Sequence, residues 1–165
     1  MSYTITHSDY GAVINDQKIA MMAADKYDVN KSPLDDYFLD YRDYPTQVAY
    51  MKRLAGLRPD ICNLVNIGQT YEGRDMYVLT IAEHPDKPMA YHQANVHARE
   101  WIAHPSLTYF TKQLIEGYEK NEEITTLVNS YSWHMLLHAN PDGYAYSRKS
   151  VIAGRVAREQ IFANG

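Results

Sequence analysis

The chain has 165 residues, of which 45% are hydrophobic and 22% charged, a length and composition typical of one globular domain with its own core. The net charge of -4 leaves no basic stripe for phosphates, so we expect no nucleic-acid partner. The apolar runs are too short to span a bilayer, the N-terminal residues lack the pattern of a signal peptide, and the lone Cys62 excludes an internal disulfide.

The first part of the chain predicts a strand, a helix and a polar connection. Residues 3–7 alternate in the pattern of a strand, and a capped helix is predicted from residue 8 or 9 to about residue 27. Residues 25–44 are polar, and we interpret them as a linker or an extended surface segment. The apolar residues available for the packed face of the helix are Val13, Ile14, Ile19 and Met22.

A second helix is predicted from Pro45 to Pro59, followed by strands. The β pattern begins at Cys62 and continues to the turn at residues 71–74, where Gly73 can adopt a positive backbone angle. A strand over residues 76–82 and a turn at residues 85–88 follow. The residues predicted to pack along the second helix are Val48, Met51, Leu54 and Ala55.

The second half alternates strands with helices. Small and apolar residues over 89–96 predict a buried strand, and a helix capped by Asn121 precedes a strand over residues 131–139. A turn is predicted at 140–143 and a short helix at 155–162. The helix predicted over 105–118 packs through Leu107, Phe110, Leu114 and Ile115.

This order of elements predicts an α/β fold with a partial mixed sheet flanked by helices. The connection from residue 96 to residue 131 is long enough to cross over and give a parallel pair of strands.

The chemistry-bearing feature is His97 followed three residues later by Glu100, at the predicted end of a strand. Imidazole nitrogen and carboxylate oxygen are both zinc ligands, and strand ends are where α/β sheets bind their ligands. The spacing alone has a structural alternative, a histidine packed at the strand end and a glutamate that starts a helix.

Three blocks of sequence resemble the carboxypeptidase A/B family of zinc metallocarboxypeptidases. They are HAREW at His97, the preceding NIGQTYEGRDMYVLTI, and NPDGY from Asn140. Together they cover about residues 42–147, and the chain resembles the N-terminal part of the family's enzymes and the first part of their fold.

The resemblance implies that zinc is the cofactor, that His97 and Glu100 are two of its ligands, and that Arg99 contributes to substrate binding. The family's second histidine ligand and its general-base glutamate would lie beyond the chain end, so no catalytic residue is assigned here. The substrates it implies are the C-termini of peptides and proteins, and the location is extracellular by analogy. Trp101 is expected to pack, and Glu72 and Arg74 to hold their turn.

The resemblance also divides the chain. Residues 1–24 resemble the end of an inhibitory pro-segment, residues 25–41 an activation linker with Lys31 as a tryptic cleavage point, and residues 42–147 a partial peptidase domain. Residues 148–165 form a divergent tail, in which Arg155 matches a family arginine only by position. We therefore weigh an enzyme against a truncated, catalytically inactive relative with at most a binding role, and expect the 165-residue chain itself to be nearly inactive.

Several residues depart from the family pattern or bear on the ligand set. Asn95 replaces the usual glycine, and asparagine tolerates a left-handed backbone. His138 replaces an apolar residue, and we favour a buried, hydrogen-bonded histidine over a substitute ligand. We expect the same of His92 and His134, whereas His104 is predicted on a helix surface.

Overall fold

The structure is a computed structural model that describes residues 10–24 and 26–152. The strand predicted at 3–7, the helix at 155–162 and Arg155 lie outside these residues. The described elements, in chain order, are α1 (Tyr10–Ala24), η1 (Asp35–Leu39), α2 (Tyr44–Leu57), β1 (Cys62–Gln69), β2 (Asp75–Ile81), β3 (Met89–Gln93), α3 (Ala103–Gly117), α4 (Glu122–Ser130), β4 (Ser132–Leu136) and α5 (Pro141–Ile152).

Among the described residues, four strands form one mixed sheet in the order β1-β2-β4-β3. β1 pairs with β2 and β2 with β4 in antiparallel register, whereas β3 and β4 are parallel. The connection through α3 and α4 makes this parallel pair possible. The predicted α/β fold with a mixed sheet flanked by helices is confirmed.

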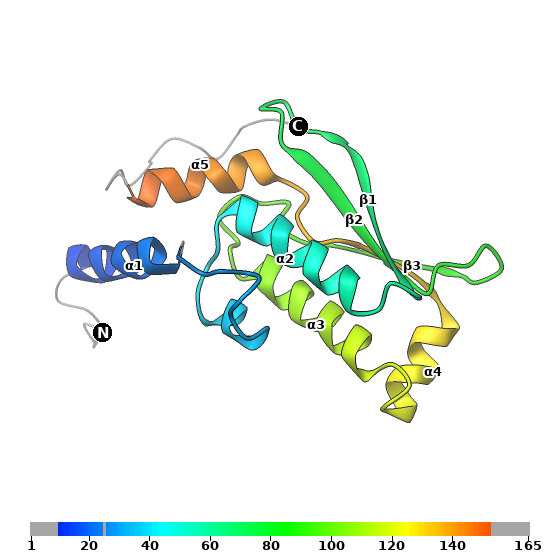
Figure 1. Cartoon of the computed structure of the whole chain (residues 1–165). Helices are drawn as coiled ribbons and strands as arrows, with labels where there is room; N and C mark the ends of the chain where they lie inside the picture. The colour runs from blue at the N-terminus through cyan, green and yellow to red at the C-terminus, as the bar shows by residue number, and fades with distance from the viewer. Residues whose placement is uncertain (1–9, 25, 153–165) are drawn as a thin grey trace, which may run out of the picture.

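The core lies between the sheet and helices α2, α3 and α4, while α1 and α5 pack against each other at the opposite end (Figure 1). Fully burying a large aliphatic side chain contributes about 2 kcal/mol, so the main cluster supplies most of the stabilisation. Its largest buried aliphatic members are Met51, Leu54, Leu79, Ile81, Ile115, Met135 and Leu137.

Local signals positioned several elements as predicted. The Asp43 carboxylate accepts from the Thr46 amide at 2.9 Å and caps α2, whose first turn contains Pro45. Asn121 caps α4 by accepting from the Ile124 amide at 3.0 Å. Gly73, at the tip of the β1–β2 hairpin, has φ of 76°, a left-handed conformation that glycine adopts without strain.

The predicted packing face of α1 is wrong, and that of α3 is wrong in part. In α1 the buried side chain is Met21, whereas Val13, Ile19 and Met22 are exposed. In α3, Leu107 packs against the core as predicted, but Phe110 is 37% exposed. The buried face of this helix contains Leu114 and Ile115 as predicted, together with His104, Thr108, Thr111 and Lys112.

The strand predicted to be buried over residues 89–96 is exposed along β3. Met89 is 66% and Tyr91 50% exposed, and β3 is an edge strand among the described residues. The apolar composition of this strand was therefore not a sign that its side chains are buried.

The interpretation of residues 25–44 as an extended surface segment is wrong in part. Tyr37 of η1 is buried and stacks on Tyr50 of α2, with ring centroids 3.7 Å apart. Arg53 of α2 donates to the carbonyls of Val29 and Ser32, so the segment packs firmly on the domain. The boundary of the proposed linker at residue 41 stays a prediction.

The turn predicted at residues 140–143 is the start of α5. Asn140 caps this helix by accepting from the Gly143 amide at 2.9 Å, and Pro141 occupies its first turn. The helix continues past Ser147 to Ile152, where the sequence indicated no clear pattern.

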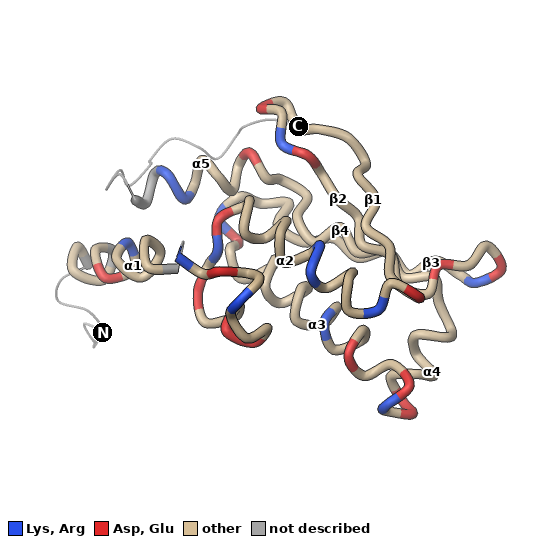
Figure 2. The backbone as a smooth tube through the Cα atoms, in the orientation of Figure 1, with Lys and Arg blue, Asp and Glu red and all other residues tan. Residues whose placement is uncertain are grey.

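Charges of both signs are interspersed along the described backbone, for example at the tip of the β1–β2 hairpin (Figure 2). None of the helices in the described ranges combines the length and hydropathy that a bilayer crossing requires.

Candidate metal site

The site forms where the chain leaves β3. After the strand, the Ala94 amide donates to the Leu136 carbonyl at 3.1 Å, and the Ala139 amide donates to the Ala94 carbonyl at 2.9 Å. Asn95 then has φ of 57°, and its side chain is buried. Asparagine tolerates this left-handed conformation, as the sequence predicted, and it turns the chain out of the sheet just before His97.

His97 and Glu100 point toward each other across the turn that follows. The Nδ1 atom of His97 lies 2.9 Å from Oε1 of Glu100, and the Glu100 amide donates to the His97 carbonyl at 3.1 Å. Their side chains are 76% and 59% exposed. The two side chains are therefore in contact, and their convergence on a shared metal ion stays a prediction.

The donor chemistry fits part of a zinc site. Zinc takes imidazole nitrogen and carboxylate oxygen at about 2 Å, and a structural or catalytic site uses at least three protein ligands. Within the described ranges, no group of three or more His, Cys, Asp or Glu side chains gathers at one point. The pair thus offers two ligands, and zinc binding itself stays a prediction.

The neighbours of this pair divide into exposed and packed residues. Arg99 is exposed, and its role in substrate binding stays a prediction. Trp101 is buried against Met21 and Tyr144, and its Nε1 donates to Ser147 Oγ at 2.8 Å. Its predicted packing role is confirmed.

The β1–β2 turn is tied to α5 through Asp142. The Arg74 guanidinium lies 2.5 Å from both Glu72 and Asp142, and Thr70 Oγ1 donates to Asp142 at 2.7 Å. Partial burial raises the pKa of Asp142, but the hydrogen bonds from Thr70, the Glu72 amide and Arg74 outweigh it and hold the pKa below its ordinary value. Glu72 and Arg74 hold their turn as predicted. The part played by Asp142 was missed.

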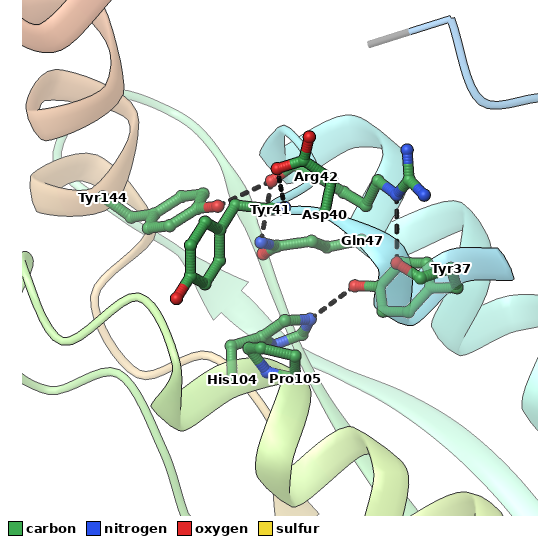
Figure 3. Close-up of a pocket in the computed structure, with 8 residues that line it drawn as sticks. All are labelled: Tyr37, Asp40, Tyr41, Arg42, Gln47, His104, Pro105 and Tyr144. Carbon is green, nitrogen blue, oxygen red and sulfur yellow. Dashed lines mark hydrogen bonds between the residues drawn. The ribbon is translucent and has the colours of Figure 1, made fainter. Parts of the chain in front are cut away.

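His104 is buried, which corrects its predicted place on a helix surface. It is 1% exposed, its Nδ1 lies 2.8 Å from the Leu137 carbonyl, and its Nε2 lies 2.7 Å from the Tyr37 hydroxyl (Figure 3). A carbonyl only accepts, so Nδ1 carries the proton and Nε2 accepts from Tyr37. Burial lowers the pKa of His104 to about 4, against the opposing effect of the Leu137 carbonyl.

A small cavity with no room for a water molecule lies beside this hydrogen bond. Gln47 Nε2 and the Tyr144 hydroxyl both donate to the Arg42 carbonyl there, at 3.0 and 2.7 Å (Figure 3). Its polar lining is thus taken up by structural hydrogen bonds around residues 37–47.

His138 is buried, as predicted, but the predicted hydrogen bonds to its ring are absent among the described residues. Its ring packs against Tyr44, Tyr144 and His104, with centroids 5.3, 4.9 and 5.4 Å apart. Neither ring nitrogen has a hydrogen-bond partner in the part of the chain that the structure describes. Burial and the neighbouring His104 hold the pKa of His138 well below its usual range.

The other two strand histidines differ from the prediction of burial. His92 is exposed and stacks on Trp133, with ring centroids 5.7 Å apart. His134 is partly exposed and lies 4.0 Å from Glu83.

The chain resembles known proteins over most of its length. A family model described as zinc carboxypeptidase matches residues 47–162. Zinc carboxypeptidase A 1 of Drosophila melanogaster is 34% identical over 113 residues, which are 65% of this chain and 26% of that protein. The inactive metallocarboxypeptidase ECM14 of Uncinocarpus reesii is 34% identical over 119 residues, 67% of this chain and 20% of that protein.

The carboxypeptidase B of Astacus astacus is also 34% identical, over 65% of this chain and 35% of its own length. A crystal structure of thrombin activatable fibrinolysis inhibitor shares the fold, with a TM-score of 0.72 and 24% identity over 84% of this chain and 34% of that one.

The chain thus spans between 20% and 35% of the lengths of these relatives. The boundary at residue 148 stays a prediction, although the family match continues to residue 162. The match over residues 47–162 and the shared fold identify the chain as a member of the zinc carboxypeptidase family.

Proposed function

We propose that His97 and Glu100 supply two of the ligands of a zinc site in a metallocarboxypeptidase that releases C-terminal residues from peptides and proteins. The observation that supports this proposal is the 2.9 Å approach of His97 Nδ1 to Glu100 Oε1 at the end of a sheet strand. A bound zinc ion would lower the pKa of a water ligand and polarise the scissile carbonyl. Arg99, exposed beside the pair, would then contact the peptide.

The same proposal covers the pro-segment, the activation linker and the location of the enzyme. We assign residues 1–24 to the end of a pro-segment and residues 25–41 to an activation linker, with an extracellular location by family analogy. Lys31 is 84% exposed, as a cleavage point requires. Its neighbours on the linker are held by α2, so cleavage there would leave residues 32–41 on the domain.

A second candidate is a catalytically inactive member of the family with at most a binding role. It is favoured by the two ligands available among the described residues and by the similar protein that is named as inactive. Catalytic zinc sites use three protein ligands and an open position, so the pair alone would bind zinc weakly.

A zinc titration of the purified chain tests the site itself. We expect that His97→Ala and Glu100→Gln each weaken binding, whereas His84→Ala does not. His84 is a matched control because it is also exposed and lies 3.5 Å from a carboxylate, Asp86. Binding that both site variants leave unchanged would refute the proposed ligands.

Peptide cleavage separates the two candidates. Peptides ending in Phe, Leu, Lys or Arg are incubated with the chain, with and without a chelator. Release of the last residue that the chelator abolishes supports the enzyme. Zinc binding that depends on His97 and Glu100, without any release, supports the inactive relative.

A further inference from the structure

One face of the first two turns of α5 lies directly against the candidate metal loop, which we define as residues 97–101. The contacts come from Asn140, the cap of the helix, and from Gly143 and Ser147. Spacings of three and four residues place these positions on one side of a helix.

Asn140 links the start of α5 to the residue that precedes His97. Its Oδ1 accepts from the Gly143 amide at 2.9 Å, and its Nδ2 donates to the Val96 carbonyl at 3.1 Å. Capping the helix uses the side-chain oxygen of Asn140 and leaves its nitrogen to donate to Val96, so one amide group makes both hydrogen bonds.

Ser147 holds the other end of the metal loop. Its Oγ accepts from Trp101 Nε1 at 2.8 Å and lies 3.0 Å from the Ala98 carbonyl and 2.8 Å from the Tyr144 carbonyl. The single hydroxyl proton can be donated to either carbonyl, and Ser147 is buried.

Gly143 lets the helix approach the loop between these two hydrogen-bonding points. A Cβ atom at this position would lie 2.9 Å from the Cβ of Ala98 and 2.7 Å from Nδ2 of Asn140. Gly143 does not have a positive φ, so the space, not the backbone conformation, is what requires glycine.

His97 and Glu100 are mostly solvent-exposed, so their own packing does not fix their positions. The backbone beneath them is what α5 holds, at Val96, Ala98 and Trp101. We propose that Asn140, Gly143 and Ser147 are positioning residues for the zinc ligands, an inference that rests on the proposed function. These three residues position the metal loop so that the side chains of His97 and Glu100 face one point.

Four variants test the role of α5. Gly143→Ala introduces the excluded Cβ, and Ser147→Ala removes the hydroxyl, whereas Ser147→Thr keeps it. Asn140→Asp keeps the capping oxygen but loses the donor to Val96. Gly56→Ala is the matched glycine control, since Gly56 also lies in a helix but has open space around it.

Two readouts are taken on the full chain after circular dichroism has shown that each variant is folded. The first is hydrogen exchange at the Glu100 and Ala103 amides, which donate to the His97 and Glu100 carbonyls. The second is zinc affinity by competition with a chromophoric chelator.

We expect Gly143→Ala, Ser147→Ala and Asn140→Asp to speed exchange in the loop about five-fold and to weaken zinc about ten-fold. Ser147→Thr and Gly56→Ala should match the unaltered chain in both readouts.

Unchanged exchange in both Gly143→Ala and Ser147→Ala overturns the inference. Faster exchange with zinc affinity equal to that of the unaltered chain also overturns it, because the contacts would then be structural only. If the unaltered chain shows no zinc binding that His97→Ala weakens, the proposed function fails by that result, and the exchange data alone decide whether α5 holds the loop.

Discussion

Lowering the pH from 7 to 4 is expected to destabilise this fold through His104. The ring is buried and neutral, donating from Nδ1 to the Leu137 carbonyl and accepting from the Tyr37 hydroxyl at Nε2. A second proton on the ring would take the position of the Tyr37 proton and would place a charge among buried groups. The titratable groups nearby are Tyr37 itself, His138, and the cavity-lining Asp40, Arg42 and Tyr144.

The magnitude follows from the difference in pKa between the two states. Burial lowers the pKa of His104 from its ordinary 6.5 to about 4. Between these values the unfolded chain binds a proton that the folded chain does not. The free energy of unfolding is therefore unaffected above pH 6.5, falls between pH 6.5 and 4 by about 3 kcal/mol, and levels off below pH 4. His138 acts in the same direction, since its pKa is also lowered.

Urea unfolding followed by circular dichroism between pH 7.5 and 4 measures this dependence. His104→Asn retains a donor for the Leu137 carbonyl but cannot titrate, so the groups that do not interact with His104 cancel in the comparison with the unaltered chain. We expect the variant to be less stable at pH 7 by about 1–2 kcal/mol, because Tyr37 loses its acceptor, and to lose about 3 kcal/mol less on acidification. His84→Asn, at an exposed histidine, should keep the original slope. Equal slopes for the unaltered chain and His104→Asn would refute the reasoning.

Three substitutions give further stability predictions, each measured by urea unfolding at pH 7. His138→Leu replaces a buried ring whose nitrogens have no partner in the described ranges, and should raise the free energy of unfolding by about 1 kcal/mol; a loss would contradict it. Tyr37→Phe removes the donor to His104 and should cost about 1–2 kcal/mol, whereas no loss would mean that this hydrogen bond adds nothing to the stability of the fold. Gly117→Ala places a Cβ 2.4 Å from Ile124 Cδ1 and should cost about 1–3 kcal/mol, so unchanged stability would show that Ile124 shifts freely.

The elements that the sequence predicted well are those with a local physical signal. Pro45 and Asn121 mark helix starts, and Gly73 marks a tight turn, because each depends on the residue's own backbone or side-chain chemistry. The same chemistry was present at Asn140 and Pro141, where a cap followed by proline at N1 was interpreted as a turn. A helix-start interpretation of those residues would have found α5.

Packing faces and edges were predicted poorly because they depend on distant residues. Apolar periodicity assigned Phe110 to the core of α3, but the buried face of this helix contains His104, Thr108 and Lys112, whose polar atoms all have partners. Hydropathy cannot anticipate a buried polar residue whose hydrogen-bond partner lies more than 30 residues away. In the same way β3 has the composition of a central strand and the position of an edge strand.

At the candidate site, blocks that are separate in the sequence are joined by hydrogen bonds in the fold. Nothing in the sequence indicated why the turn at residues 71–74 and the block from Asn140 should lie together. In the fold, Asp142 joins the turn to α5, and Asn140 and Ser147 join α5 to the metal loop. His97 and Glu100 are exposed on a short loop, so a metal site there would depend on the blocks that hold the loop as well as on the two side chains. A variant of Gly143 that leaves the helix intact therefore tests how the loop is held without removing either candidate ligand.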